Sequence, residues 1–466
     1  MVMDKLKNWF KASDPVLLAA DCMCVAALAA LVAVWLITES ETPQGRFMAV
    51  VSALLFAVLG VRFLHVWMAD WSRRRREPPV SGLREPIRPS VLLRIFFLSL
   101  AGCFAALLLV YIVQLILGER DSFRASLELW TRLDTQHYLD IAREGYLSEG
   151  PEGRLMQLVF LPGYPMAVRL MALLFREYLH AGLAVSGLCF GGSGVLLYLL
   201  VRLDRDHAAA LRTLKYACIL PGSVFFAGPM SESMFFLLSL ACVYLARREK
   251  WLAACLMGAL AAFTRSLGLV LAVPVCFELI SVTIERREGG WDRTARRGRV
   301  LDFACLLLIP AGFGAYCLVC RAVTGDAFRF LVYQREHWNQ SLGFFFGTAG
   351  YQTDYLVKYW SRGELEKVMG LSLPNLFCGL GSLLAVGLAA RRLRPSYTAY
   401  FIAYYVIAIG TTWLLSGPRY LAAAFPLGLA LASVTENRRI DSACTIFFTV
   451  LFVLYDYVLV ARWQVW

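Results

Sequence analysis

The sequence predicts an all-α polytopic membrane protein, and three observations carry that prediction. Of the 466 residues, 59% are hydrophobic and only 17% are charged. The mean hydropathy is +0.60, far from the average of soluble proteins. The apolar residues also fall into runs that are long enough, or nearly so, to cross a bilayer core of roughly 30 Å. No soluble core could absorb that many apolar runs.

Basic residues mark one side of the membrane. The net charge is +12, and the Lys and Arg residues collect in short loops between the apolar runs, as the positive-inside rule expects. The two strongest clusters, RRRREPPVSGLREPIR from Arg73 and ERREGGWDRTARRGR from Glu285, both fall on the cytoplasmic side when the runs are threaded in order. The positive charge therefore reflects the orientation of the protein in the membrane, and we expect no nucleic-acid partner.

Cysteine usage and the N-terminus add two further expectations. All thirteen cysteines lie inside apolar stretches, so we expect neither a disulfide framework nor a structural zinc site. The N-terminus has the look of a signal peptide, but its apolar run is about spanning length and lacks a small-residue cleavage site. We expect a retained signal anchor.

Threading the apolar runs predicts about thirteen transmembrane helices in two regions. Residues 164–176 are too short to span and should form an interfacial or re-entrant segment. Residues 1–91 form an N-terminal two-helix extension, and 92–466 form the main membrane domain. Large outer loops with short amphipathic helices are expected at about 119–163 and 324–369. The expected spans are 15–38, 47–69, 92–118, 180–202, 212–229, 232–247, 252–264, 267–283, 301–323, 372–391, 397–415, 419–435 and 443–462.

This topology gathers the unusual polar residues at the extracytoplasmic face. Ionisable groups at membrane depth are costly and indicate function by default. Their clustering on one side predicts a single site. The residues are Asp134, His137, Asp140, Glu144, Ser231, Glu232, Arg265, Gln334, Arg335, Glu336, His337, Trp338, Arg419 and Tyr420.

Asp134 has two interpretations. Apolar residues at helical spacing after it predict an amphipathic helix along the membrane surface that begins near Asp134. An acid there serves either as an N-cap or helix-dipole partner, or as a general base for an acceptor hydroxyl. His137, one turn later, could contact Asp134 or a phosphate, or simply lie at the interface. Asp140 and Glu144 are expected to face solvent.

The two arginines and FLPGYP also carry alternatives. Guanidinium groups bind phosphate oxygens bidentately, and Arg265 and Arg419 should lie at headgroup level, where a lipid-borne phosphate lies. The structural alternative is snorkelling of both side chains to the interface. FLPGYP, which contains Tyr164, breaks the helix where an outer loop re-enters the bilayer, and architecture explains it as well as substrate contact does.

These residues resemble the PIG-V-like mannosyltransferases, a family in the GT-C superfamily of polyprenyl-phosphate-sugar-dependent transferases. The first outer loop is similar to the family pattern W-D-x-x-x-Y-x-x-I-A-x-x-G-Y from Asp134 to Tyr146. FLPGYP is similar to F-F-P-L-Y-P. PGSVFFAGPMSESMFF, FTRSLGLVL, GDAFRFLVYQREHW and SGPRYLAAAFPL also resemble family segments in the right order. The resemblance runs from about residue 92 to the end.

Three positions depart from the family pattern. Leu133 replaces the usual Trp before the acid, Met230 stands where a Tyr is common, and Ser266 replaces the Pro after Arg265. The acid and both arginines are kept. The departures therefore put sugar or acceptor preference in doubt more than the reaction.

The resemblance implies a GT-C-like bundle that moves a sugar, mannose in this family, from a polyprenyl-phosphate carrier to an acceptor hydroxyl with inversion. Asp134 would be the catalytic base, and Arg265 and Arg419 would stabilise the departing phosphate. Glu232 would orient a sugar hydroxyl or an arginine. The remaining expected substrate-site residues are His137, Tyr138, Tyr164, Gln334, Trp338 and Tyr420. No cofactor is expected to be required, although some GT-C enzymes use a divalent metal.

Two other classes of membrane protein are the alternatives to an enzyme. A transporter or flippase of a lipid-linked sugar would carry its polar residues near the bilayer midplane, on broken helices. A scaffolding subunit would have lost its catalytic acid, whereas Asp134 is present. The expected partners are a polyprenyl-phosphate-linked sugar, membrane lipid, and a glycan, glycolipid or protein acceptor. We expect a bacterial plasma membrane with the site facing outward, or a lumenal site if the membrane is that of the ER.

Overall fold

The computed structural model describes residues 15–38, 42–76, 87–119, 122–146, 156–287 and 293–463. Helices form nearly all of this part of the chain. Its only β pairing is a single antiparallel bridge between Leu342 and Thr411. The all-α fold class predicted from the sequence is confirmed.

Eight helical segments among the described residues are long and apolar enough to cross a membrane, which confirms an integral membrane protein. Shorter apolar helices cover Gly163–Phe175, Trp251–Thr264 and Phe425–Val434, so the expected count of about thirteen spans is not confirmed. The candidate spans are Leu17–Leu36, Pro43–Asp70, Pro89–Ile116, Tyr178–Arg202, Ser266–Glu285, Gly298–Thr324, Leu365–Arg392 and Arg438–Val460.

The bounds of the helices are as follows. The long ones are α2 (Pro15–Thr38), α3 (Pro43–Arg76), α4 (Pro89–Ile116), α9 (Tyr178–Arg202), α13 (Ala272–Arg287), α15 (Leu308–Thr324), α17 (Phe345–Ser361), α19 (Leu373–Ala389) and α23 (Arg438–Val460). Those of intermediate length are α6 (Asp134–Glu144), α8 (Gly163–Phe175), α10 (His207–Ile219), α11 (Glu232–Arg247), α12 (Trp251–Thr264), α14 (Arg293–Cys305), α16 (Arg329–Trp338), α20 (Pro395–Ile409) and α22 (Phe425–Val434). Short turns are α5 (Phe123–Ser126), η1 (Leu127–Thr131), η2 (Met156–Val159), η3 (Pro221–Phe226), η4 (Ser266–Leu271), α18 (Leu365–Lys367), η5 (Val368–Ser372), η6 (Ala390–Arg392) and α21 (Gly417–Ala422).

The helix ends follow local sequence chemistry. The Asp206 carboxylate accepts a hydrogen bond from the Ala209 amide at 2.8 Å and caps α10, and Asn437 caps α23 in the same way. Proline occupies the first turn of α4, where its missing N–H costs no intrahelical bond. At the C-terminal end of α15, Gly325 adopts a φ of +79°, the left-handed conformation that terminates helices.

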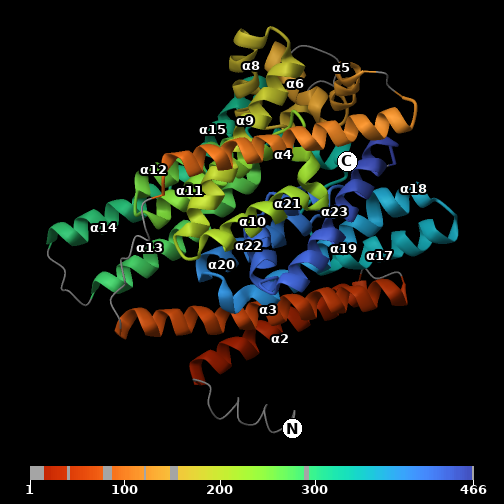
Figure 1. Cartoon of the computed structure of the whole chain (residues 1–466). Coiled ribbons are helices and arrows are strands. Elements are labelled where there is room, and N and C mark those ends of the chain that lie inside the picture. The colour runs from red at the N-terminus through yellow and green to blue at the C-terminus, as the bar shows by residue number, and fades with distance from the viewer. Residues whose placement is uncertain are drawn as a thin grey trace.

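The long helices run across the view in Figure 1. The last turn of α3, the end of α13 and the start of α14 lie toward its left side, while α5, α18 and the C-terminus lie toward its right. The two arginine-rich segments predicted for one membrane side therefore begin or end at the same end of the bundle. Segment α6 and the short α8 lie together at the top of the view.

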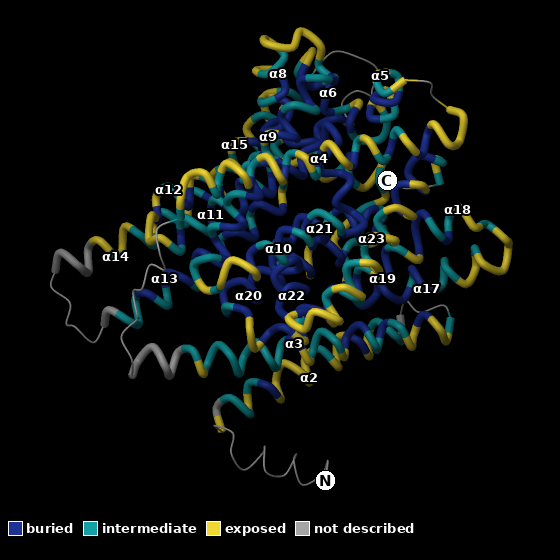
Figure 2. The backbone as a smooth tube through the Cα atoms, viewed as in Figure 1, coloured by how far each residue is buried: buried dark blue, intermediate teal, exposed yellow. Residues whose placement is uncertain are grey.

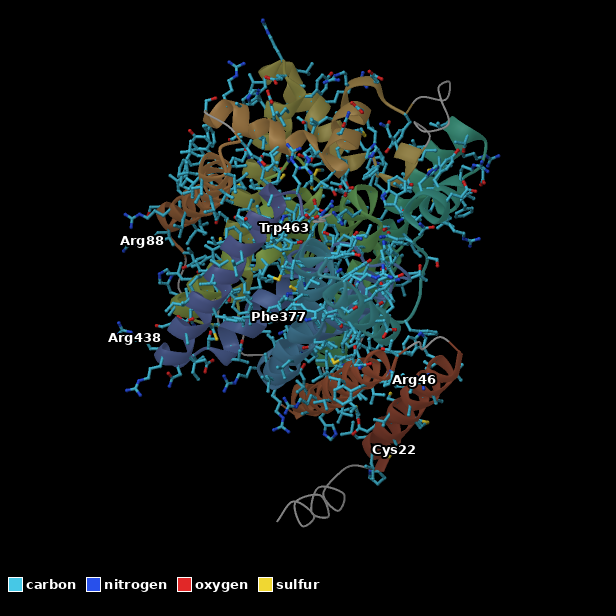
Figure 3. The ribbon with its side chains drawn as sticks, turned by 90° about the vertical axis from the view of Figure 1, so that its right-hand side faces the viewer. Cys22, Arg46, Arg88, Phe377, Arg438 and Trp463 are labelled. Carbon is cyan, nitrogen blue, oxygen red and sulfur yellow. The ribbon has the colours of Figure 1, made fainter. Side chains whose placement is uncertain are left out.

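Burial follows the pattern of a protein surrounded by lipid. The centre of the bundle is buried, whereas outward faces of α2, α3 and α4 are exposed (Figure 2). Many of these exposed residues are apolar, including Met23 at 68%, Phe47 at 66% and Leu98 at 58% exposure. Figures 1 and 3 both place α2 and α3, which carry Cys22 and Arg46, at the periphery of the bundle.

Three of the expected helices are broken. The segment expected at 212–229 divides into α10 and η3, because Pro221 lacks the N–H that an α-helix would need. The segment expected at 301–323 divides into α14 and α15 around Leu306 and Leu307. The segment expected at 419–435 divides into α21 and α22 before Pro426.

The expected outer loop at 324–369 contains the helices α16 and α17 and the short α18. Helix α17 packs against α3 of the N-terminal extension, and Asp354 lies on this packed side, where its carboxylate accepts a hydrogen bond from the Thr42 hydroxyl. Its Gly347 and Gly350 lie directly on the indole of Trp35 in α2. The N-terminal helices therefore pack on this segment. The division at residue 91 stays a prediction.

Candidate functional site

Four charged side chains form a continuous chain of ion pairs. Arg419 Nη1 donates a hydrogen bond to Asp134 Oδ2 at 2.6 Å, and Arg419 Nε donates to Glu232 Oε1 at 2.5 Å. Arg265 Nη1 donates to the same Glu232 oxygen. These residues come from four separate elements: α6, α11, the α12–η4 turn and α21. The fold thus joins sequence segments that are up to 285 residues apart.

Glu232 is the shared anchor of the two arginines. Its side chain is 1% exposed, and the Arg419 side chain is 3% exposed. Burying a guanidinium is costly unless a carboxylate compensates for it. As the first residue of α11, Glu232 also lies at the positive end of the helix dipole. The carboxylate thereby fixes both guanidinium groups relative to each other.

The hydroxyl groups of Tyr138 and Ser231 connect this chain of ion pairs to α6. Tyr138 and Ser231 share a hydrogen bond of 2.8 Å between their oxygens. Ser231 Oγ also accepts a hydrogen bond from Arg265 Nη1 at 3.0 Å. The Tyr138 ring is buried between Phe160 and Tyr164, with ring centroids 5.1 and 5.4 Å away. Tyr138 therefore locks α6 against the turn that carries Ser231 and Glu232.

Asp134 is the first residue of the predicted amphipathic helix, which the structure confirms as α6. Leu133, directly before it, has a φ of +56° and a ψ of −143°, a conformation that normally requires glycine. Residues held in such conformations cost about 1–3 kcal/mol and persist only where the surrounding structure enforces them. The Asp134 side chain remains 30% exposed, so its carboxylate can reach a ligand.

Close-packed glycines set the position of each arginine. A Cβ atom on Gly222 would lie 2.0 Å from the carbonyl oxygen of Pro418 and 2.7 Å from the amide nitrogen of Arg419. A Cβ atom on Gly163, in FLPGYP, would lie 2.9 Å from Thr264 Cα, directly before Arg265. Each glycine therefore lets one backbone segment approach the segment that carries an arginine.

Replacing Gly222 with alanine should displace the start of α21 and with it Arg419. Overpacking of this kind typically costs about 1–3 kcal/mol. We expect a lower thermal-unfolding midpoint in detergent. The matched control is Gly381→Ala, because a Cβ atom at Gly381 meets nothing within 4 Å. An unchanged midpoint for Gly222→Ala would contradict the close approach.

A cavity of about 450 Å³ opens beside the ion-pair chain. Aromatic side chains, among them Phe160, Trp338 and Trp413, form much of its wall. The ring centroids of Phe160 and Trp338 lie 5.8 Å apart, nearly perpendicular to each other. Seven of the ten residues predicted for the site line this cavity. They are Asp134, Tyr138, Arg265, Gln334, Trp338, Arg419 and Tyr420.

A hydrogen-bonded bridge closes one side of the cavity. Gln334 Nε2 donates to Gln340 Oε1 at 2.6 Å, and Gln340 Nε2 donates to the carbonyl oxygen of Trp413 at 2.9 Å. The bridge joins α16 to the segment that precedes α21. It keeps residues of the expected second outer loop over the same cavity as Arg419.

The other three predicted site residues lie behind the cavity wall. Glu232 holds the arginines, as described above. Tyr164 is fully buried, and its hydroxyl contacts the Gly182 carbonyl oxygen and Ser186 Oγ, both at 2.9 Å. The His137 ring stacks on Phe160 with centroids 4.8 Å apart. Burial lowers the pKa of His137 despite the opposing effect of Asp134 and Asp140, which favours the neutral imidazole.

Several cavity residues were missed from the sequence. Phe160 begins the FLPGYP motif, Ser416 begins SGPRYLAAAFPL, and Trp413 lies three residues before Ser416, so proximity to recognised segments was the available signal. Gln340 lies two residues after GDAFRFLVYQREHW, whereas Tyr359 lies near no recognised segment. Among the residues the structure describes, no group of three His, Cys, Asp or Glu side chains is placed to hold a metal ion.

The arginines keep donors that a ligand could use. Each guanidinium has five N–H groups. The hydrogen bonds found within the described residues engage Nε and Nη1 of Arg419 and Nη1 of Arg265. Nη2 of both residues is left for a ligand. The cavity can therefore offer an anion two fixed guanidinium groups and offer a hydroxyl one carboxylate.

The sequence profile of the family described as Mannosyltransferase (PIG-V) matches residues 118–288. The mouse (Mus musculus) protein GPI alpha-1,6-mannosyltransferase 2 is 33% identical over 153 residues, which are 30% of this chain and 29% of that protein. The match therefore spans less than a third of the length of the curated relative.

Two solved structures of ArnT from Cupriavidus metallidurans are also similar. The one bound to undecaprenyl phosphate has a TM-score of 0.43 at 16% identity, over 81% of this chain and 76% of that one. The one in the apo state has a TM-score of 0.44 at 14% identity, over 73% and 76%. Residues 118–288, which include Asp134, Glu232 and Arg265, thus carry the sequence pattern of the PIG-V mannosyltransferase family, as the resemblance predicted.

Proposed function

We propose that this protein is an integral membrane glycosyltransferase that moves mannose from a polyprenyl-phosphate carrier to an acceptor hydroxyl on the extracytoplasmic side. The observation that carries the proposal is the chain Asp134–Arg419–Glu232–Arg265 beside a cavity of about 450 Å³. It supplies a carboxylate and two guanidinium groups within one site. The PIG-V match over residues 118–288 supports mannose as the sugar.

Asp134 acts as the general base in this proposal. Its Oδ2 is held by Arg419, and the partly exposed carboxylate borders the cavity. The carboxylate takes the proton of the acceptor hydroxyl while the acceptor oxygen attacks the anomeric carbon. Attack from the face opposite the phosphate inverts the configuration at that carbon.

Arg265 and Arg419 act on the leaving group. As the bond between the anomeric carbon and the phosphate oxygen breaks, its electron pair stays on the polyprenyl phosphate. Fixed guanidinium groups stabilise this developing charge without having to reorganise during the reaction. Their preorganisation rests on Glu232, which binds both of them.

The aromatic wall suits the sugar. Binding sites of about this size combine apolar and aromatic walls with a few polar groups that fix orientation. Phe160, Trp338 and Trp413 offer ring faces to the C–H surface of a hexose, and Gln334 offers an amide. Ser266, which departs from the family pattern, lines this cavity, and the cavity is therefore the place where sugar preference would be set.

The test is transfer by the purified protein in lipid vesicles. With polyprenyl-phosphate-[¹⁴C]mannose and a panel of glycan and glycolipid acceptors, we expect label to move to an acceptor, with polyprenyl phosphate released in equal amount. GDP-mannose should not serve as donor. Label that crosses the vesicle membrane while still attached to its carrier, without transfer, would instead indicate a flippase.

A further inference from the structure

A second cavity, of about 570 Å³, lies at the basic end of the bundle. Its walls come from α3, the end of α9, the segment from η6 to the start of α20, and α22. This basic end is the end of the bundle at which α3 and α13 terminate. It lies opposite the end that carries α5 and α18 (Figure 1). The cavity shares no lining residue with the candidate active site.

The lining of this cavity is both basic and apolar. Arg205, Arg391, Arg392 and Arg394 line it, against the acids Asp70 and Asp204. Val66 and Ala69 of α3, together with Val201, Leu393 and Leu429, supply an apolar surface. A charged rim above an apolar wall matches a lipid headgroup better than it matches a free ion.

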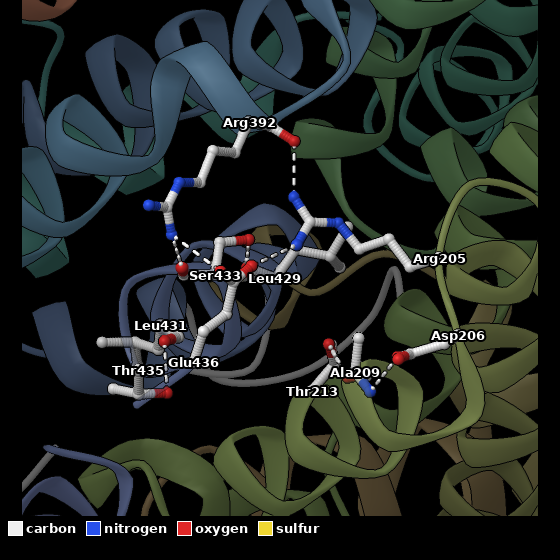
Figure 4. Close-up of polar contacts among 10 residues, drawn as sticks. All are labelled: Arg205, Asp206, Ala209, Thr213, Arg392, Leu429, Leu431, Ser433, Thr435 and Glu436. Atoms are coloured by element: carbon white, nitrogen blue, oxygen red, sulfur yellow. Dashed lines mark hydrogen bonds and ion pairs between the residues drawn. The ribbon is translucent and has the colours of Figure 1, made fainter. Parts of the chain in front are cut away.

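Two arginines of the cavity already converge on one carboxylate. Arg205 Nη1 lies 3.5 Å from Glu436 Oε1, and Arg392 Nη1 lies 3.3 Å from Glu436 Oε2 (Figure 4). The Glu436 side chain is 51% exposed, so these pairs are screened and exchangeable. A phosphate presents more acceptor oxygens than a carboxylate and fits the same fork.

An ion-pair network that is buried at Glu278 and Arg247 and exposed at Asp204 forms the floor of the cavity. Arg394 binds the Glu278 carboxylate through Nε and Nη2, at 2.6 and 2.7 Å. Arg247 binds the Asp204 carboxylate through two bonds of 2.7 Å. The Glu278 and Asp204 carboxylates are therefore each held by an arginine in a two-bond ion pair.

By formal charge, the side chains of the cavity and its network carry one net positive charge. The cavity and its network hold five guanidinium groups, with Arg247 included, against four carboxylates, namely Asp70, Asp204, Glu278 and Glu436. Arg391 is exposed, and within the described residues its side chain has no ion pair or hydrogen bond. A phosphodiester carries one negative charge and would balance this surplus.

We propose that this cavity binds the phosphodiester headgroup of an anionic phospholipid from the adjoining leaflet. Arg391, Arg392 and Arg205 bind the phosphate, and the glycerol backbone lies on the apolar wall. Basic pockets between transmembrane helices are a recurring form of lipid recognition. Because α3 supplies one wall, the bound lipid connects the N-terminal helices to the rest of the bundle.

Thermal unfolding of the purified full chain in detergent tests this site. Short-chain phosphatidylglycerol should raise the unfolding midpoint in a saturable manner, since a ligand that binds the folded state stabilises it. Arg391→Gln should raise the half-saturating lipid concentration about tenfold, because a charge-assisted contact is lost. Ala69→Trp, which fills the cavity from α3 and leaves every arginine in place, should remove the response.

Matched controls decide the outcome. Arg438→Gln removes the same charge from an exposed side chain that projects away from the bundle (Figure 3), and its response should equal that of the native protein. Equal responses to phosphatidylcholine and phosphatidylglycerol, or an unchanged response in both Arg391→Gln and Ala69→Trp, would overturn the proposal. An equal response to inorganic phosphate would show a free-anion site instead. None of these readouts requires sugar transfer, so they are independent of the proposed function.

Discussion

Replacing Asp134 with asparagine should lower kcat for sugar transfer about 10²–10⁴-fold, the usual contribution of a positioned general base. Asparagine has nearly the same shape, and its carbonyl oxygen can still accept the hydrogen bond from Arg419. The start of α6 should therefore keep its place. What is lost is the ability to take the proton of the acceptor hydroxyl. Initial rates with saturating donor and acceptor measure the effect.

Asp140→Asn is the matched control. Asp140 lies on the same helix, is partly exposed, and is 4.0 Å from Arg143 rather than beside the cavity. Its loss should leave kcat unchanged. Comparable losses in the Asp134 and Asp140 variants would point to the stability of α6 instead of a catalytic base.

Replacing Glu232 with alanine should be the most destabilising change at the site. Arg265 and Arg419 would lose the carboxylate that both of them bind, while their guanidinium groups stay largely buried. Breaking a buried pair in this way costs about 3–5 kcal/mol. A fall of the thermal-unfolding midpoint in detergent would report it. Glu232→Gln should lose less, because the amide oxygen still accepts hydrogen bonds.

Glu366→Ala provides the comparison for Glu232→Ala. Glu366 is exposed on the short helix α18, so its removal should change stability by less than about 0.5 kcal/mol. If the Glu232 and Glu366 variants unfolded at the same temperature, the role of Glu232 as the shared anchor would be wrong.

Hydropathy predicted several helices well because they are apolar along their full length, whether they face lipid or pack inside the bundle. The helices expected at 15–38, 180–202 and 232–247 agree with α2, α9 and α11 to within two residues. Helix breaks were harder to predict. Pro221 and Pro426 interrupt apolar runs whose composition does not change, and only the packed structure shows that the backbone turns there.

Short amphipathic helices were expected in the loop at 324–369, but the bounds and the partner of α17 could not be predicted, for a different reason. Polar and charged residues, among them Asp354 and Lys358, interrupt its apolar sequence. The helix is covered by α3 and by Trp35 of α2. A partner that lies more than three hundred residues earlier in the chain cannot be identified from local composition.

At the site, sequence reasoning identified the residues better than their arrangement. Helical spacing and charge singled out Asp134, Arg265 and Arg419, which line one cavity. They could not show that Glu232 lies behind the arginines or that Tyr164 is buried against α9, because both placements depend on how distant helices pack. The Tyr164 and Gly163 contacts support the structural alternative for the second half of FLPGYP, whereas Phe160 at its start lines the cavity.

The most direct measurement separates donor binding from transfer in one preparation. Polyprenyl-phosphate-mannose binding and mannose transfer should both be measured for the native protein and for Asp134→Asn in the same vesicles. We predict that the variant binds the donor at least as tightly, because Arg419 then faces a neutral amide instead of a competing carboxylate, while transfer is lost. Transfer at the native rate by the variant, or loss of donor binding together with transfer, would contradict the assignment of Asp134 as the base of a glycosyltransferase.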